Sequence, residues 1–181
     1  MAATLKQVEA APASYPDVPS GLSASAAALD ADAIWQRIES WIAHRWNERE
    51  VVWTVEVENG ADEWIIPLAP VSTGYVEQWR GGAWDEVLFV HGPMGLLLPS
   101  DGTFRITANV GSDKSPPAAV MEAYRRLAEY LADKPDRSAA SSYSVNMGGA
   151  IEESYNRNPA WVARALEYSG AADLLRPYRR P

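Results

Sequence analysis

The residues able to carry out chemistry are few in this chain and are not spaced for catalysis. His44 and His91 are the only histidines, and the chain has no cysteine. His44 stands among charged residues, as expected on a solvated helix face, and His91 begins an expected turn, His91-Gly92-Pro93. A metal site needs several converging ligands. Two scattered histidines without an HxxxH spacing therefore predict no metal centre.

The acidic and glycine pairs do not suggest an active site either. The carboxylates at 85–86 and 152–153 are adjacent in sequence, so they diverge in a helix or strand and make a weak acid–base pair. The glycine pairs at 81–82 and 148–149 lack the flanking residues of a phosphate-binding loop. No serine lies in a G-x-S-x-G pattern. The sequence predicts a protein that is not an enzyme and binds no cofactor.

Binding is the chemistry that the C-terminal segment predicts. The segment follows a helix stop at Gly170 and combines apolar, aromatic and cationic side chains, which are typical anchors of buried interfaces. We expect it to dock on a partner through these residues: Leu174, Leu175, Arg176, Tyr178, Arg179 and Arg180. A frayed end is the alternative. The arginines also reverse the local charge of an acidic chain, so a groove on a partner protein is favoured over DNA.

Composition restricts the classes of protein to which the chain can belong. Its 181 residues, 47% hydrophobic and 22% charged, indicate a globular domain with extensions. No apolar run reaches the length of a membrane span, and the N-terminal region has no export signal, so we expect synthesis in the cytoplasm. The net charge of −8 argues against gripping DNA through its phosphates. DNA passing by without binding remains compatible with it.

Element signals along the chain predict an α+β fold, in which helices pack with an inserted antiparallel β-meander. A flexible N-terminal arm is expected over residues 1–28, because its Ala, Ser and Pro content buries little. A single domain is expected over 29–168 and a C-terminal tail over 169–181. Within that domain we expect a helix at 30–47, a β-meander at 51–110, a helix at 116–132, a long loop at 133–157 and a short helix at 158–168.

The meander is predicted from alternation and turn signals. Val51, Trp53 and Val55 lie on one face of a first strand, and Asn59-Gly60 favours a type I′ hairpin turn. The return strand is expected at 63–67. The remaining strands are expected at 75–79, 84–90, 96–98 and 103–110.

This order of elements resembles the head–tail connector family, the adaptor proteins of long-tailed bacteriophages and gene transfer agents. The resemblance covers residues 30–181 and lies in the helix, the inserted meander with Ile65-Ile66-Pro67-Leu68-Ala69-Pro70-Val71, the proline-started helix and the C-terminal Leu174-Leu175-Arg176-Pro177-Tyr178-Arg179-Arg180. The tryptophan-rich sheet and the loop at 133–157 depart from the family pattern.

The resemblance implies a structural protein of the virion neck, not an enzyme. It implies a ring, usually of twelve copies, bound beneath the portal protein, with the C-terminal residues inserted into the portal. The other face of the ring would receive a tail-side stopper or tail-terminator protein, and DNA would only pass through the lumen during ejection. No membrane is involved. Neighbouring subunits of the homo-oligomer are the remaining partners.

Aromatic residues leave a second function open. Trp79 and Trp84 flank the turn at 81–82 and are candidate subunit or tail contacts, together with Tyr143 and Val145 in the long loop. Plain packing is the more common role of tryptophan. The alternative function is a non-catalytic β-module that binds carbohydrate or protein through exposed tryptophans.

Overall fold

The computed structural model describes residues 1–133, 142–146, 152–156 and 162–179, with side chains in the first and last of these ranges. Helices and antiparallel sheets occur together, so the predicted α+β class is confirmed. Where the sequence predicts one domain over 29–168, the chain divides into two compact units. The first contains Met1–Pro16, Glu39–Ser115 and, at the C-terminus, Arg179, and the second contains Asp17–Ile38 and Pro116–Tyr178.

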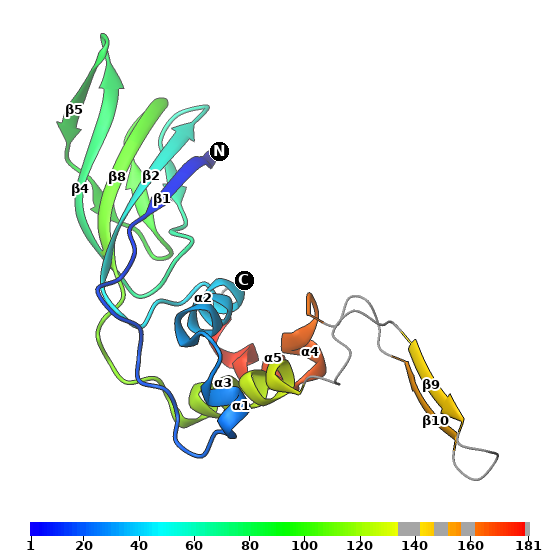
Figure 1. Ribbon diagram of the computed structural model, residues 1–181. Coiled ribbons are helices and arrows are strands. Elements are labelled where there is room, and N and C mark those ends of the chain that lie inside the picture. Colours follow the sequence, from blue (N-terminus) through cyan, green and yellow to red (C-terminus); the bar gives the residue numbers. More distant parts are fainter. Residues whose placement is uncertain (134–141, 147–151, 157–161, 180–181) are drawn as a thin grey trace. The chain divides into compact units, whose positions relative to one another are not determined.

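The first unit is built from two antiparallel sheets (Figure 1). The larger sheet has the order β1-β2-β8-β4-β5 and the smaller has the order β3-β7-β6. Their bounds are β1 Ala2–Glu9, β2 Arg49–Val57, β3 Asp62–Trp64, β4 Val71–Arg80, β5 Ala83–Val87, β6 Val90–His91, β7 Leu96–Leu98 and β8 Gly102–Val110.

Alternation along β2 and β8 places the core of this unit on one face of the larger sheet. Trp53 and Val55 of β2 are buried beside Phe104 and Ile106 of β8, as expected for strands with period two. Trp64 of β3 belongs to the same cluster, and its ring lies 5.4 Å from that of Trp53. Three large aromatic side chains, Trp53, Trp64 and Phe104, therefore lie in the core of the sheet unit.

The turn at Asn59-Gly60 forms, but the hairpin predicted around it does not. Both residues have positive φ, 69° and 95°, as a type I′ turn requires. The strand that follows, β3, pairs with β7 in the smaller sheet. Since β2 is already paired with β1 on one side and with β8 on the other, it has no free edge for β3. The predicted meander is wrong in this respect.

The prediction of a flexible N-terminal arm over residues 1–28 is also wrong in part. Strand β1 (Ala2–Glu9) pairs with β2, and a short helix, α1 (Ala24–Ala27), follows. Composition understated the order of this segment because β1 is stabilised by main-chain hydrogen bonds to β2. Residues of almost any type can form such bonds, since every non-proline residue has a backbone N–H and C=O.

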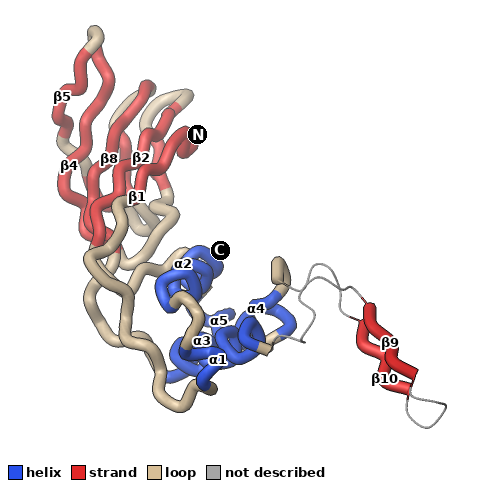
Figure 2. Tube along the Cα trace, viewed as in Figure 1, coloured by secondary structure: helices blue, strands red, loops and turns tan. Residues whose placement is uncertain are grey.

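The second unit is helical around α3 (Ala118–Ala132), as the blue segments of Figure 2 show. The first eight residues of α2 (Ala31–Ile42) belong to it. Its other elements are α1, the hairpin of β9 (Ser142–Asn146) and β10 (Glu152–Asn156), α4 (Ala165–Tyr168), α5 (Ala171–Leu175) and the 3-10 turn η1 (Arg176–Tyr178). The rings of Trp35 and Tyr124, both buried, lie 4.9 Å apart.

Three of the predicted boundaries differ from the observed ones. Helix α2 ends at Ile42 and not at 47, because Ala43 takes a left-handed conformation with φ of 55°. The predicted loop at 133–157 contains the hairpin of β9 and β10. The short helix predicted at 158–168 is observed as α4, and its predicted start at 158 lies outside the described residues.

Candidate functional site

The C-terminal segment is folded as α5 and η1, which corrects the expectation of a tail outside the core. Gly170 has φ of 72° and lets the chain turn from α4 into α5. Leu175 is then fully buried, and α5 contacts α3 and α4. Leu175 is therefore a core residue of the helical unit and is not available as a docking anchor. The Leu-Leu pair by itself did not distinguish these roles.

The remaining candidate anchors lie at the surface. Arg176 and Arg179 are exposed, whereas Leu174 and Tyr178 are half-buried. The guanidinium group of Arg179 lies 5.0 Å from the centroid of the Trp41 ring, a cation–π contact. Arg180 lies outside the described residues. The segment thus presents exposed arginines at and just after a short helical turn, with the half-buried ring of Tyr178 between them.

Trp79 and Trp84 face each other across the β4–β5 hairpin. They are paired in register, and their ring centroids are 5.1 Å apart in an edge-to-face arrangement. The guanidinium group of Arg105 lies 4.6 Å from the Trp84 ring and donates two hydrogen bonds to the carboxylate of Glu77, at 2.6 and 2.7 Å. Hydrogen bonding by Arg105 lowers the pKa of Glu77.

This hairpin is accessible at its tip. Trp79 is 46% exposed, and the β4–β5 hairpin projects past the end of β8 (Figure 1). A cross-strand tryptophan pair stabilises such a two-stranded projection. The pair therefore stabilises the hairpin, and its Trp79 ring also forms an exposed aromatic surface. The side chains of Tyr143 and Val145, the other candidate contacts, lie outside the described part of the chain, although their backbone forms β9.

A buried cluster of charged side chains was missed by the sequence analysis. Glu39 is 1% exposed, Arg45 7% and Arg49 6%. Arg49 lies 2.9 Å from Glu39 and 3.2 Å from Glu9, and Arg45 lies 2.6 Å from Glu9. Glu9 lies 36 positions before Arg45, and Glu39 and Arg49 lie on different elements, α2 and β2, so no helix or strand spacing could have shown the cluster.

The two carboxylates of this cluster have opposite pKa shifts. Burial raises the pKa of Glu39, and the hydrogen bond from the Trp46 N–H and the charge of Arg49 offset this only in part. Burial acts in the same direction on Glu9, but hydrogen bonds and charge from Arg45 and Arg49 outweigh it and lower the pKa. Each of the four side chains, Glu9, Glu39, Arg45 and Arg49, forms an ion pair with at least one of the others. Such mutual pairing is typical of a structural ion cluster.

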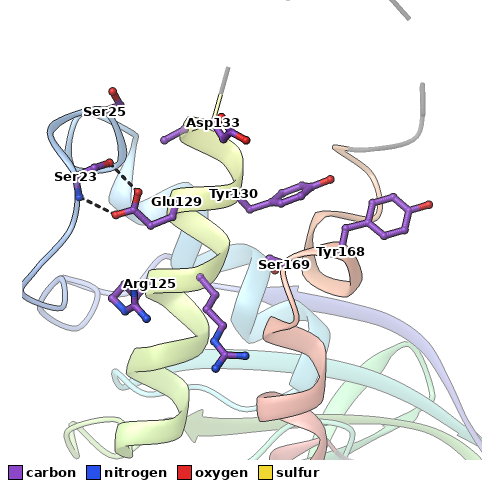
Figure 3. Close-up of a pocket in the computed structure, with 10 residues that line it drawn as sticks. Ser23, Ser25, Arg125, Glu129, Tyr130, Asp133, Tyr168 and Ser169 are labelled. Atoms are coloured by element: carbon purple, nitrogen blue, oxygen red, sulfur yellow. Dashed lines mark hydrogen bonds between the residues drawn. The ribbon is translucent and has the colours of Figure 1, made fainter. Parts of the chain in front are cut away.

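An open pocket of about 760 Å³ lies in the helical unit, between the start of α1, α3 and the end of α4 (Figure 3). One of its two carboxylates, Glu129, accepts hydrogen bonds from the N–H and hydroxyl of Ser23, at 2.7 and 2.8 Å; the other is Asp133. Arg125 and Arg126 both donate to Glu122. Glu129, Arg125 and Arg126 are therefore each engaged with a neighbouring side chain.

Glu122 and Arg126, four positions apart on α3, form an ion pair at 2.9 Å. Hydrogen bonds from Arg125 and Arg126 lower the pKa of Glu122 from 4.5 to about 2. Because the folded-state pKa lies below the unfolded one, this contribution to stability is complete above pH 4.5 and is lost as the pH falls towards 2. We expect Glu122→Gln to lose less stability than the native chain between pH 4.5 and 2, as measured by urea unfolding. Equal losses would contradict the assignment.

No protein-family model and no curated protein matches the chain. Among the residues that the structure describes, no three histidine or acidic side chains gather as a metal ion would require. Within the same residues, every helix is too short or too polar to cross a lipid bilayer.

Proposed function

We propose that the chain is a head–tail adaptor, one subunit of a ring between the portal and the tail of a phage or phage-like particle. The observation that carries the proposal is the C-terminal segment, where Arg176 and Arg179 are exposed at the end of a chain of net charge −8. The family resemblance of residues 30–181 and the α+β class agree with it. The proposed function is structural and needs no catalytic residues.

The mechanism that follows is geometric. Copies close a ring through one heterologous contact repeated around an axis. Each copy then presents one C-terminal segment to the portal, so many weak contacts act together and hold the joint by avidity. An acidic lumen would repel the phosphates of passing DNA and let it slide. Since Leu175 is buried, the contact is made by a folded helical turn and not by an extended peptide.

The tryptophan pair, with Trp79 exposed and Trp84 half-buried, supports a second candidate function. Trp79 is 46% exposed beside Trp84, as in a β-module that binds carbohydrate or protein through aromatic faces. Arg105 covers part of the Trp84 ring, which leaves Trp79 as the more available face. The pair lies in the sheet unit, whereas Arg176 lies in the helical unit. Because Arg176 and the tryptophan pair belong to different units, substitutions at Arg176 and at Trp79 can test the two functions separately.

We expect the double variant Arg176→Glu and Arg179→Glu to bind the portal protein of the same particle at least about tenfold more weakly, because interface arginines are frequent hot spots. Sedimentation with assembled portal rings measures this, and negative-stain images locate the adaptor on the ring. Trp79→Ala is the matched control and should bind as the native chain does. Full binding by the double variant would contradict the proposal, and loss of binding only in Trp79→Ala would favour the tryptophan surface.

A further inference from the structure

The outer face of the smaller sheet carries exposed aliphatic side chains. Trp64, Leu96 and Leu98 are buried in the core that this sheet shares with the larger one, so the alternate positions of its strands point outward. We call the exposed aliphatic residues of this face and its margins the aliphatic patch: Ile65 (56% exposed), Leu88 (95%), Val90 (62%), Met94 (66%) and Leu97 (42%). All of them belong to the sheet unit.

The members of the aliphatic patch lie on the same side of this sheet. Val90 of β6 and Leu97 of β7 are partners in register, and partners across an antiparallel pair share one face. Leu88 stands two positions before Val90, and the residue between them packs against the core. Met94 lies in the turn that joins β6 to β7, and Ile65 directly follows the inward-facing end of β3. The patch therefore forms one surface around β6 and β7.

This surface carries little charge, although the chain is acidic. Residues 88–98 contain no Asp, Glu, Lys or Arg, whereas the whole chain has a net charge of −8. Glu63, the partner of Leu97 on β3, is held by the turn, where its carboxylate accepts hydrogen bonds from the N–H groups of Met94 and Gly95 at 2.7 and 2.9 Å. Acidic surfaces of two copies repel each other. The aliphatic patch is a face on which a second copy can settle without that repulsion.

The area of the patch matches what a pair of copies needs. At their exposed fractions these side chains leave roughly 500 Å² of surface in water, a size that marks interaction sites on soluble proteins. Two such patches in contact would remove about 1,000 Å² from water, which is the area that a specific protein–protein interface needs. A patch that meets its own copy about a two-fold axis requires no second docking surface, and such pairs are the most common closed oligomers.

We propose that two free copies of this chain pair through the aliphatic patch, with each patch covering the other about a two-fold axis. Val90 and Leu97 supply the strand positions of this contact, and Leu88 and Met94 supply its most exposed side chains. The inference goes beyond the proposed function, because it uses none of the C-terminal residues assigned to the portal. The pair is a state of the free protein, distinct from the heterologous contact of the ring.

Sedimentation equilibrium of the full chain over a dilution series tests the pairing. We expect a monomer–dimer equilibrium that the double variant Leu88→Glu and Val90→Glu weakens at least about tenfold, because like charges would face each other across the contact. The matched control is Leu5→Glu with Val8→Glu, which changes the same residue types by the same charge at exposed positions of β1. This control should pair as the native chain does. Met94→Glu, in the turn, should weaken pairing as well.

Two further measurements separate this contact from others. Circular dichroism first verifies that each variant is folded. The double variant, mixed with native chain, should not join it, since a patch that meets itself would then bury glutamates against apolar side chains. Higher salt should tighten the native pair, because it screens the repulsion between two acidic copies.

Four results would overturn the proposal. The native chain could stay monomeric at roughly 1 mM, a concentration at which even a weak pair forms. The β1 control could lose pairing as much as the patch variant does. Native chain and patch variant could form a one-to-one complex, which would mean that the patch meets a different surface. Salt could weaken the pair, which would indicate an ionic contact.

Discussion

Replacing Arg49 with methionine is expected to lower the free energy of unfolding by about 3–5 kcal/mol, the usual cost of breaking a buried ion pair by removing one partner. Arg49 is 6% exposed and lies 2.9 Å from Glu39, which is itself 1% exposed. Methionine fills much of the same space, so the loss would come from the unpaired carboxylate and not from a large cavity. Urea unfolding of the full chain measures the difference.

The pH dependence of this loss distinguishes a charge effect from a packing effect. Burial already raises the pKa of Glu39, and removal of the nearby cation should raise it further. A carboxyl group whose folded-state pKa lies above the unfolded value favours folding more as the pH falls. We therefore expect Arg49→Met to be less destabilised near pH 5 than at pH 8. A loss that does not change with pH would contradict the electrostatic explanation.

Arg105→Met is the matched control for Arg49→Met. Arg105 also pairs with a glutamate, Glu77, at 2.6 Å, but its side chain is 35% exposed. Exposed ion pairs contribute about 0–1 kcal/mol because water and salt screen them. Similar losses in the two variants would mean that burial does not determine the strength of these pairs.

The second large effect is expected in the helical unit. Leu175→Ala should lower the free energy of unfolding by about 2–5 kcal/mol, since the side chain is fully buried and its removal leaves a cavity. Deletion of residues 174–181 should cost at least as much. From sequence alone both leucines were expected to be docking anchors of a C-terminal tail, and the burial of Leu175 corrects that expectation.

Leu174→Ala provides the comparison, because it removes the same atoms from a half-buried neighbour in the same helix. We expect a smaller loss there than at Leu175, with thermal unfolding followed by circular dichroism. If the two variants unfold alike, or if the deleted chain is as stable as the native one, α5 does not contribute to the core as described.

The sequence alone was sufficient wherever a local pattern decides the outcome. Alternation at Val51, Trp53 and Val55 predicted a strand with one buried face, and helical spacing predicted α3 to within two residues at its start. The conformation of Asn59-Gly60 was also predicted, because positive φ is a property of the residues in the turn. These features depend on neighbours a few positions away, so one sequence contains the necessary information.

Only the tertiary structure decided which strands pair, which leucine is buried and which charges meet. β3 pairs with β7 because both edges of β2 are occupied. Leu175 is buried and Leu174 is not, although they are chemically identical, because only one of them faces the interior of the helical unit. Arg45 forms an ion pair with Glu9, which lies 36 positions earlier in the sequence. Contacts between distant residues depend on the whole fold, and no local spacing shows them.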